Sequence, residues 1–273
     1  MKINSLEVSK KIKRIILDTA FKAGHKSAHI GGALSLSDIL SVLYANNFIK
    51  FDCNNPEWKN RDRLILSKGH ACLAYYALLN IMGFINEKDL DMFENDGADL
   101  LGHPIKNLEK GIEYSTGSLG IGVSISVGVA LAAKLKLQDH KVYAILGDGE
   151  LNEGSVWEAF MCAAKYSLNN LTFIIDKNNH QQTGTTEFIM RNENLREKLL
   201  NFNLNAQEID GHNHNDIENA LKNQKENPKV IIANTIKGKG FSFAENNNIW
   251  HHSVLTEKIY KDALIEIDND KSK

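Results

Sequence analysis

Two continuously apolar segments, each followed by polar residues, place the strongest constraint on the fold of this chain. The segment 141–147 (KVYAILG) runs into Asp148, and the segment 171–176 (LTFIID) is followed by Asn178. A strand that is apolar along its whole length is typical of a parallel sheet that is covered on both faces. The 30 residues between Asp148 and Asn178 suffice for a loop, a helix and a strand, as a parallel connection requires.

Strand and helix patterns alternate along the rest of the chain. Further strands are predicted at 63–67 and 229–235, and helices before Gly24 and within 28–48, 68–83, 115–137, 156–167 and 215–224. This alternation predicts an α/β fold, an open parallel β-sheet with helices on both faces. Right-handed crossovers bring the strand ends to one edge, where ligands bind. We therefore expect Asp148 and Asn178 at the functional edge.

The composition excludes several classes of protein. The chain has 273 residues, of which 42% are apolar, and a net charge of −2, so it offers no basic surface for nucleic acid. Three scattered cysteines indicate a reducing compartment. The charged start lacks the apolar core of a signal peptide, and no apolar run approaches the roughly 20 residues of a membrane helix. We expect a cytoplasmic protein with no nucleic-acid or membrane partner.

Asp148 and Asn178 are candidate ligands of a divalent cation. A carboxylate, an amide oxygen and a nearby backbone carbonyl form an oxygen site that needs further ligands from water and phosphate, as Mg²⁺ usually does. Gly147 and Gly149 let the backbone approach a diphosphate, and a helix that begins near Glu153 directs its amides toward it. The alternative is an ordinary turn, because GDG and NN are both common in loops.

Three histidines lie beside glycine in predicted loops or helix starts, namely His29, His70 and His103. Neutral imidazoles can donate to sugar oxygens and transfer protons near neutral pH. Each could instead be an ordinary surface or packed histidine, but their joint placement at the sheet edge favours a functional role. His212 and His214 lack such support, and we expect them at the surface.

Several motifs together resemble the transketolase family. GDG at 147–149 followed by NN at 178–179 is the signature of thiamine-diphosphate enzymes, and LGDGELNEGSVWEA resembles the segment that holds the diphosphate and the metal. Other segments occur in the family's order: HIGGALSLSDIL, SKGHA, GHP, TGSLGIG and the IKGKG…WHH region. The resemblance extends from Leu6 to His252 and implies the thiamine-diphosphate-binding fold.

The resemblance implies roles for thirteen residues. Mg²⁺, or Ca²⁺ or Mn²⁺ in its place, is ligated by the side chains of Asp148 and Asn178 and by the main-chain oxygen of His180. The implied cofactor-binding residues are His70, Gly117, Ser118, Leu119, Gly147, Asp148, Gly149, Glu153, Asn178 and His251. The implied catalytic residues are His29, His70, His103, His251 and Glu153. His29 and His103 would line the donor-sugar channel, and Glu153 would join carboxylates across a dimer interface.

The implied activity is that of a transketolase-type transferase, which moves a two-carbon ketol unit from a ketose or its phosphate to an aldose or its phosphate. The family's pyrimidine-binding domain has no counterpart in this sequence. We therefore expect one diphosphate-binding domain at 1–265, a polar, frayed tail at 266–273, and a separate C-terminal transketolase subunit that completes the site. The assembly would be a homodimeric core or a heterotetramer. Its substrate would be a pentose phosphate or an unusual sugar of a biosynthetic pathway.

Two other readings stay open. The alpha subunit of 2-oxoacid dehydrogenases and the N-terminal part of deoxyxylulose-phosphate synthase also carry GDG and NN, although GHP, TGSLGIG and WH favour transketolase. The second reading is a non-catalytic module that binds the cofactor, since a fold does not establish a function.

Overall fold

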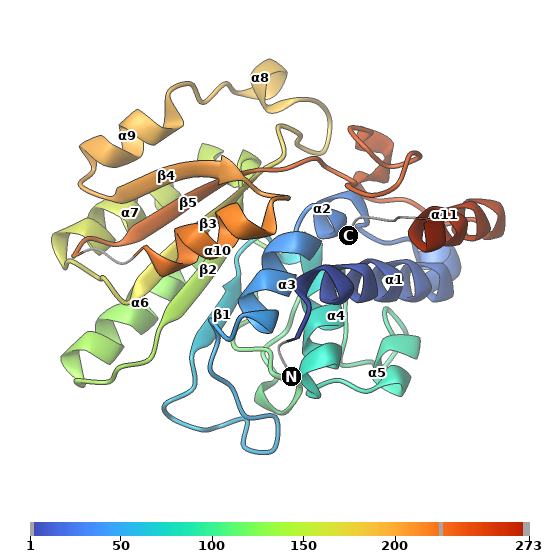
Figure 1. Ribbon diagram of the computed structural model, residues 1–273, viewed down its shortest axis with the longest axis horizontal. Coiled ribbons are helices and arrows are strands. Elements are labelled where there is room, and N and C mark those ends of the chain that lie inside the picture. The colour runs from blue at the N-terminus through green and yellow to red at the C-terminus, as the bar shows by residue number, and fades with distance from the viewer. Residues whose placement is uncertain (1–2, 224–225, 270–273) are drawn as a thin grey trace.

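The computed structural model describes residues 3–223 and 226–269 of the chain. Within this part, five parallel strands form one sheet in the order β1-β2-β3-β5-β4, with helices on both faces (Figure 1). This arrangement confirms the predicted fold class. The strands are β1 (Arg63–Leu66), β2 (Val142–Gly147), β3 (Leu171–Lys177), β4 (Asn205–Asp210) and β5 (Lys229–Asn234).

Helices of different lengths precede, connect and follow the strands. The longer ones are α1 (Ser5–Ala23), α3 (Ser37–Ala45), α4 (Cys72–Met82), α6 (Ile121–Leu135), α7 (Gly154–Lys165), α9 (Leu195–Asn201), α10 (His214–Lys222) and α11 (Glu257–Asn269). Shorter α-helical turns are α2 (Gly31–Leu34), α5 (Glu87–Asp91) and α8 (Thr186–Ile189). Single 3-10 turns are η1 (Gly24–Lys26), η2 (Gly69–Ala71), η3 (Leu108–Lys110), η4 (Gly149–Asn152) and η5 (Asn248–His251).

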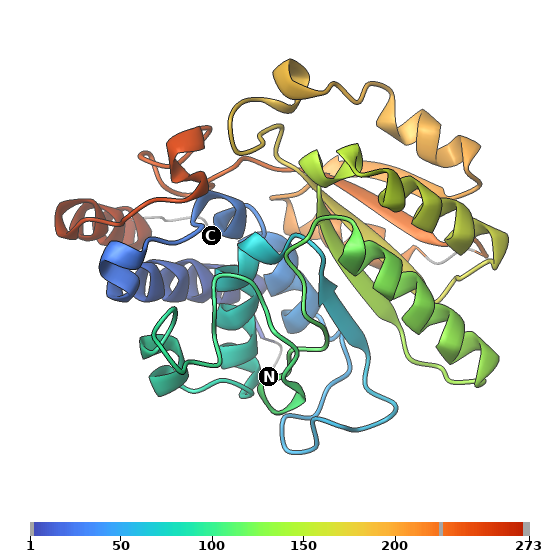
Figure 2. The same cartoon turned by 180° about the vertical axis from the view of Figure 1, so that it is seen from behind.

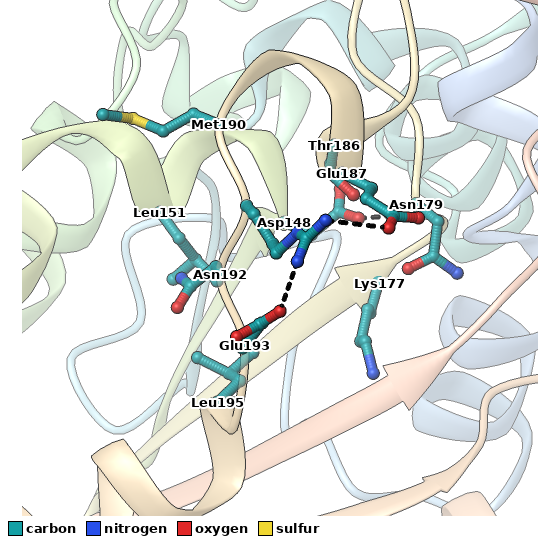
Figure 3. Close-up of a pocket in the computed structure, with 11 residues that line it drawn as sticks. Asp148, Leu151, Lys177, Asn179, Thr186, Glu187, Met190, Asn192, Glu193 and Leu195 are labelled. Carbon is teal, nitrogen blue, oxygen red and sulfur yellow. Dashed lines mark hydrogen bonds and ion pairs between the residues drawn. The ribbon is translucent and has the colours of Figure 1, made fainter.

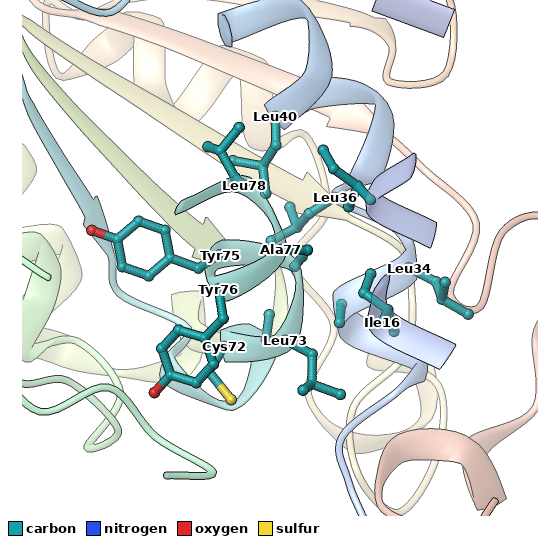
Figure 4. Close-up of a cluster of buried hydrophobic side chains, with 14 of the residues drawn as sticks. Ile16, Leu34, Leu36, Leu40, Cys72, Leu73, Tyr75, Tyr76, Ala77 and Leu78 are labelled. Atoms are coloured by element: carbon teal, nitrogen blue, oxygen red, sulfur yellow. The ribbon is translucent and has the colours of Figure 1, made fainter. Parts of the chain in front are cut away.

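Successive side chains of β1, β2, β3 and β5 enter two different hydrophobic cores, as the period of a strand requires. On β2, Tyr143 and Ile145 belong to the core beneath α1, α3 and α4, part of which is drawn in Figure 4. Ala144 and Leu146 belong to the second core, beneath α6 and α7, which cover the other face of the sheet in Figure 2. Burial on both faces explains why these strands are continuously apolar.

Helix α1 shows how the local sequence sets the bounds of an element. The side chain of Asn4 accepts a hydrogen bond from the amide of Leu6 and so caps the first turn. Val8, Ile12 and Ile16 recur every four residues and are buried. The helix ends at Gly24, whose φ of 58° favours glycine, as predicted.

Strand β4 was not predicted from the sequence. Its segment NAQEID carries no apolar run, and from Gln207 onward its residues alternate between half-buried and exposed. β4 pairs only with β5, at the edge of the sheet, so it needs no second buried face. Polar residues on an edge strand also discourage pairing with other chains.

The segment near the end of the chain forms a helix that was not predicted, and this helix includes the first residues of the expected frayed tail. Helix α11 continues through Asn269, and the carboxylate of Glu266 accepts hydrogen bonds from the amide and hydroxyl of Ser242. These bonds hold the last turns of α11 against the body of the protein. The remainder of the predicted tail, 270–273, lies outside the described residues.

The loops that follow β1, β2, β3 and β5 share the carboxyl edge of the sheet. Gly147 lies in register with Asp176, and Asp176 with Ala233, so these strands end side by side. Asp148 and Asn178 therefore reach the same edge, as predicted. Among the described helices, none is both long and apolar enough to cross a membrane.

We predict that Phe160→Ala lowers the free energy of unfolding by about 3–5 kcal/mol, because it leaves a cavity in the second core. Phe160 is fully buried, and its ring centroid lies 4.9 Å from that of Phe173. Phe188→Ala is the matched control, since Phe188 is 85% exposed. Urea denaturation measures both, and equal losses of stability would contradict the assignment of the core.

Candidate active site

A cavity of 380 Å³ opens at the carboxyl edge of the sheet, among the loops after β1, β2, β3 and β5. Eleven of the thirteen residues predicted for the site line it: His29, His70, His103, Gly117, Leu119, Gly147, Asp148, Gly149, Asn178, His180 and His251. Residues more than 200 positions apart in the sequence thus meet in one place. The remaining two, Ser118 and Glu153, are exposed and do not line the cavity.

The two candidate metal ligands are held in place by backbone amides. Asp148 accepts hydrogen bonds from the amides of Gly149, at 2.9 Å, and Asn179, at 2.7 Å. The side-chain oxygen of Asn178 accepts one from the amide of His180 at 3.1 Å. In the described part of the chain, no three His, Cys, Asp or Glu residues cluster as a metal cage would require. A cation held here would take most of its ligands from a bound phosphate and water.

Burial makes the Asp148 carboxyl sensitive to a cation. Burial, together with the nearby carboxylate of Asp176, raises the pKa of Asp148 to about 7. A divalent cation favours the ionised carboxylate and would offset both effects. The site therefore matches a metal that arrives with its own anionic ligand.

Five imidazole rings gather at one side of the cavity. The centroid of the His29 ring lies 5.8 Å from His70, 5.5 Å from His103, 5.4 Å from His251 and 4.3 Å from His252. Burial, followed by the neighbouring cationic groups, lowers the pKa of His29 to about 3 and that of His251 to about 4. Burial also holds the pKa of His70 well below its ordinary value. The rings of His29, His70 and His251 are therefore neutral near pH 7 and can donate or accept hydrogen bonds.

Two lysines that sequence reasoning did not select also line the cavity. The ammonium of Lys68 forms a buried ion pair with Asp176 at 2.5 Å. Lys237 donates to the carbonyl of Gln181 at 2.8 Å, and its nitrogen lies 3.1 Å from Nδ1 of His251. Burial, followed by the charge of Lys68, lowers the pKa of Lys237 to about 8. Both lysines lie within motifs that resemble those of the transketolase family, SKGHA and IKGKG. Their place in these motifs could have indicated that they belong to the site.

A buried carboxyl, Glu150, holds three loops of the site together. It accepts hydrogen bonds from the hydroxyl of Ser67, from the amide of Gly120 at 2.8 Å and from the amide of Gly147 at 3.2 Å. Its burial raises its pKa. The sequence analysis did not select Glu150, because glutamates in loops are usually exposed.

The cavity has the shape and the polar groups that a diphosphate needs. A Cβ added to Gly147 would meet no atom closer than Cδ of Lys68, at 3.9 Å, so the backbone is open to a ligand there. The side-chain nitrogen of Gln181 is buried and has no hydrogen-bond partner among the described residues. With the ammonium groups of Lys68 and Lys237, these donors fit a phosphorylated ligand.

His212 and His214 are not the surface residues that the sequence analysis expected. Nδ1 of His212 lies 2.7 Å from Asp38, and Nε2 of His214 lies 3.3 Å from the same carboxylate. Asp38 is buried on α3, and both imidazoles are only slightly exposed. Their partner is more than 170 residues away in the sequence, so no local pattern indicates the contact.

A second, smaller cavity of 210 Å³ lies beneath the segment that contains α8 and also reaches Asp148 (Figure 3). The guanidinium of Arg191 lines this cavity and forms ion pairs with Glu193 at 2.7 Å and with Glu187 at 3.2 Å. These carboxylates neutralise the charge that a phosphate would require. We therefore place the candidate site in the larger cavity.

Comparison with known proteins identifies the class of this domain. Residues 5–267 match the family model described as "Transketolase, thiamine diphosphate binding domain". The fold and the site thus define a thiamine-diphosphate-binding domain. The chain belongs to the transketolase family, which confirms the resemblance found in the sequence.

Relatives named as transketolase subunits match the chain along most of their length. A subunit of the apulose-4-phosphate transketolase of Phocaeicola vulgatus is 38% identical, covering 98% of this chain and 95% of the relative. The 6-deoxy-6-sulfo-D-fructose transketolase subunit SqwG of a Clostridium species is 39% identical, covering 95% and 94%. The crystal structure of Campylobacter jejuni transketolase superposes with a TM-score of 0.90 at 34% identity, but this chain spans only 44% of it.

We predict that the imidazoles of His29 and His251 stay neutral from pH 8 down to pH 5.5. Their pKa values are about 3 and about 4, so neither ring takes up a proton in this range. Since an unfolded chain binds protons near pH 6.5, stability should fall as the pH drops below that value. Imidazole NMR shifts measure the titration, with a urea-unfolded sample as control. An inflection near pH 6.5 from either folded ring would contradict the prediction.

Proposed function

We propose that this chain is the N-terminal, diphosphate-binding subunit of a two-subunit transketolase. The observation that carries the proposal is the joint placement of eleven predicted site residues around one cavity. The names of the relatives support it, because those that match the chain along nearly their whole length are called subunits. In this proposal, residues 1–265 form a single diphosphate-binding domain in the cytoplasm.

Mg²⁺ is the cation that suits the site best. Asp148 and Asn178 would supply side-chain oxygens and His180 its carbonyl, which leaves the other positions to diphosphate and water. Ca²⁺ or Mn²⁺ could take its place. Thiamine diphosphate, when bound, supplies the carbon nucleophile for ketol transfer.

The residues around the metal would hold the rest of the cofactor. His70, Gly149 and His251 would contact the diphosphate, and the open backbone at Gly147 would let it approach. Gly117, Ser118 and Leu119 would frame the middle of the cofactor and its pyrimidine ring. We add Lys68 and Lys237 to this set, because both ammonium groups line the same cavity.

His29 and His103 would bind the donor sugar. Their rings are 5.5 Å apart, and burial lowers the pKa of both, so each offers one donor and one acceptor near pH 7. Such groups can orient the hydroxyls of a ketose and move a proton between them. The substrates would be a ketose and an aldose or their phosphates, such as those of pentose phosphate metabolism.

A second polypeptide with a pyrimidine-binding domain would complete the site. Helices α6 and α7 carry exposed apolar side chains. The exposed fractions are 48% for Ile121, 75% for Leu135 and 48% for Met161. A second polypeptide packed on these helices would cover such side chains. Helix α7 begins beside Glu153. Glu153 would then join carboxylates across the interface of a heterotetramer built on a homodimeric core.

Ketol transfer tests the proposal directly. The purified chain is mixed with MgCl₂, thiamine diphosphate and ketose phosphate donors, with and without a candidate C-terminal subunit. We expect turnover only when both subunits are present. Robust turnover by this chain alone, or turnover with pyruvate as the only accepted donor, would overturn the proposed function. Cofactor binding without turnover with any partner would favour a non-catalytic module.

We predict that Asp148→Asn weakens Mg²⁺-dependent binding of thiamine diphosphate by more than about 100-fold. Loss of a residue that only supports a metal ligand typically lowers affinity by about 10- to 100-fold, and loss of the ligand itself should lower it further. Glu193→Gln is the control, because Glu193 lies outside the larger cavity. Isothermal titration calorimetry measures binding, and circular dichroism confirms that the variant is folded. Unchanged binding in Asp148→Asn would show that the metal lies elsewhere.

A further inference from the structure

We propose that Asp38 and His212 are positioning residues for the loop that carries Lys237 and His251 into the cavity. They act through the backbone amide of Ile236 and touch no group of the site themselves. The inference rests on the proposed function, which gives the cavity its ligand. It extends that function to a carboxylate of α3 and the imidazole bonded to it.

Asp38 is the buried centre of a polar group that we call the Asp38 cluster, which consists of Asp38, Ser9, Lys13, His212 and His214. The carboxylate lies 2.5 Å from the hydroxyl of Ser9, 2.7 Å from Nδ1 of His212 and 3.6 Å from the ammonium of Lys13. Burial alone would raise its pKa, but these partners hold the pKa well below its ordinary value. The carboxylate is therefore ionised and accepts hydrogen bonds from several elements.

The hydrogen bonds of His212 determine its tautomer. Nε2 accepts a hydrogen bond from the amide of Ile236 at 2.9 Å, so this nitrogen carries no proton. Nδ1 carries the proton and donates it to Asp38. A carboxylate that binds one imidazole nitrogen in this way fixes both the tautomer and the orientation of the ring. Asp38 thus aims the acceptor of His212 at Ile236.

Ile236 lies at the start of the loop that connects β5 to the histidine cluster. Just before it, the hydroxyl of Thr235 is bonded to Asp176, and just after it, the amide of Gly238 donates to the carbonyl of Gly31 at 2.9 Å. His212 supplies the anchor between these two points. It comes from the loop between β4 and α10, which has no residue in the cavity.

The position of Lys237 leaves little room for movement of this loop. A Cβ added to Gly31 would lie 3.2 Å from Cγ of Lys237, so the lysine stem packs closely against α2. Its ammonium reaches both Gln181 and His251. Releasing the adjoining amide would let Lys237 and His251 shift together, and a shift of about 1 Å is enough to weaken a preorganised site.

A second histidine of the Asp38 cluster, His214, serves as a control, because it distinguishes a role in positioning the loop from a purely structural role. His214 bonds Asp38 and the hydroxyl of Ser5, and it connects α10 to α1 without contacting the loop. Its removal should cost stability but leave Ile236 anchored. A structural role for the whole cluster predicts equal effects at both histidines.

Three variants of the 273-residue chain separate these roles. In His212→Asn, the amide nitrogen can take the place of Nδ1 and keep the bond to Asp38, but the acceptor for Ile236 is lost. In His212→Gln, the longer side chain can place its oxygen where Nε2 stood and restore that acceptor. His214→Ala is the control.

Hydrogen–deuterium exchange follows the loop, calorimetry with thiamine diphosphate and MgCl₂ follows binding, and thermal melting follows stability. We expect His212→Asn to speed exchange across 236–251 and to weaken binding by about 10-fold, the effect typical of groups that support a ligand. His212→Gln should recover both, and His214→Ala should lower the melting temperature with binding within about twofold of wild type.

Normal exchange and binding in His212→Asn, no recovery in His212→Gln, or an equal loss of binding in His214→Ala would each overturn the inference. Failure of the proposed function is distinguishable from these outcomes. In that case the wild-type chain itself would show no Mg²⁺-dependent binding, and the role of the pair at the site would be rejected with it. Exchange across 236–251 would still show whether His212 anchors the loop.

Discussion

The buried carboxylate of Asp176, at the end of β3, is the interaction on which the carboxyl edge of the sheet depends. It is fully buried and accepts hydrogen bonds from Lys68 at 2.5 Å, Ser35 at 2.6 Å, Asn178 at 3.3 Å and the hydroxyl of Thr235. Burial alone would raise its pKa, but the ammonium of Lys68 and the other donors lower it on balance. Removing one partner of such a buried pair typically costs about 3–5 kcal/mol, because the remaining charge is left uncompensated.

The partners of Asp176 come from the loops after β1, β3 and β5 and from α2, so one carboxylate sets the relative positions of these segments. It also orients Asn178, whose amide nitrogen points to Asp176 while its oxygen stays with the candidate metal site. Ser35 binds Asp176, and Asp38 lies one helical turn further along the same segment. The segment from α2 to α3 therefore connects two buried carboxylates, and both hold loops that reach the cavity.

The sequence predicted the parts of this protein that local patterns control. β2 and β3 are buried on both faces and so read as apolar runs, and parallel pairing brings Asp148 and Asn178 to one edge. β4 was missed because an edge strand needs no apolar run. Lys68 and His212 were missed for another reason. Each is positioned by a hydrogen bond to a carboxylate, 108 and 174 residues away respectively, and only the fold brings these partners together.

The electrostatics of the cavity explain why its ligands depend on one another. The carboxylate of Asp176 is satisfied by its own donors, as is the Glu150 carboxyl, which leaves Asp148 as the acidic group open to a cation. Neutral imidazoles and two ammonium groups face it. Whereas Lys68 is paired with Asp176, the Lys237 ammonium bonds only a carbonyl and an imidazole and so lacks a negatively charged partner among the described residues. A diphosphate would supply that negative charge, and a cation held by Asp148 would keep the carboxylate ionised at neutral pH. Each ligand would complete the site for the other, so metal and diphosphate should bind cooperatively.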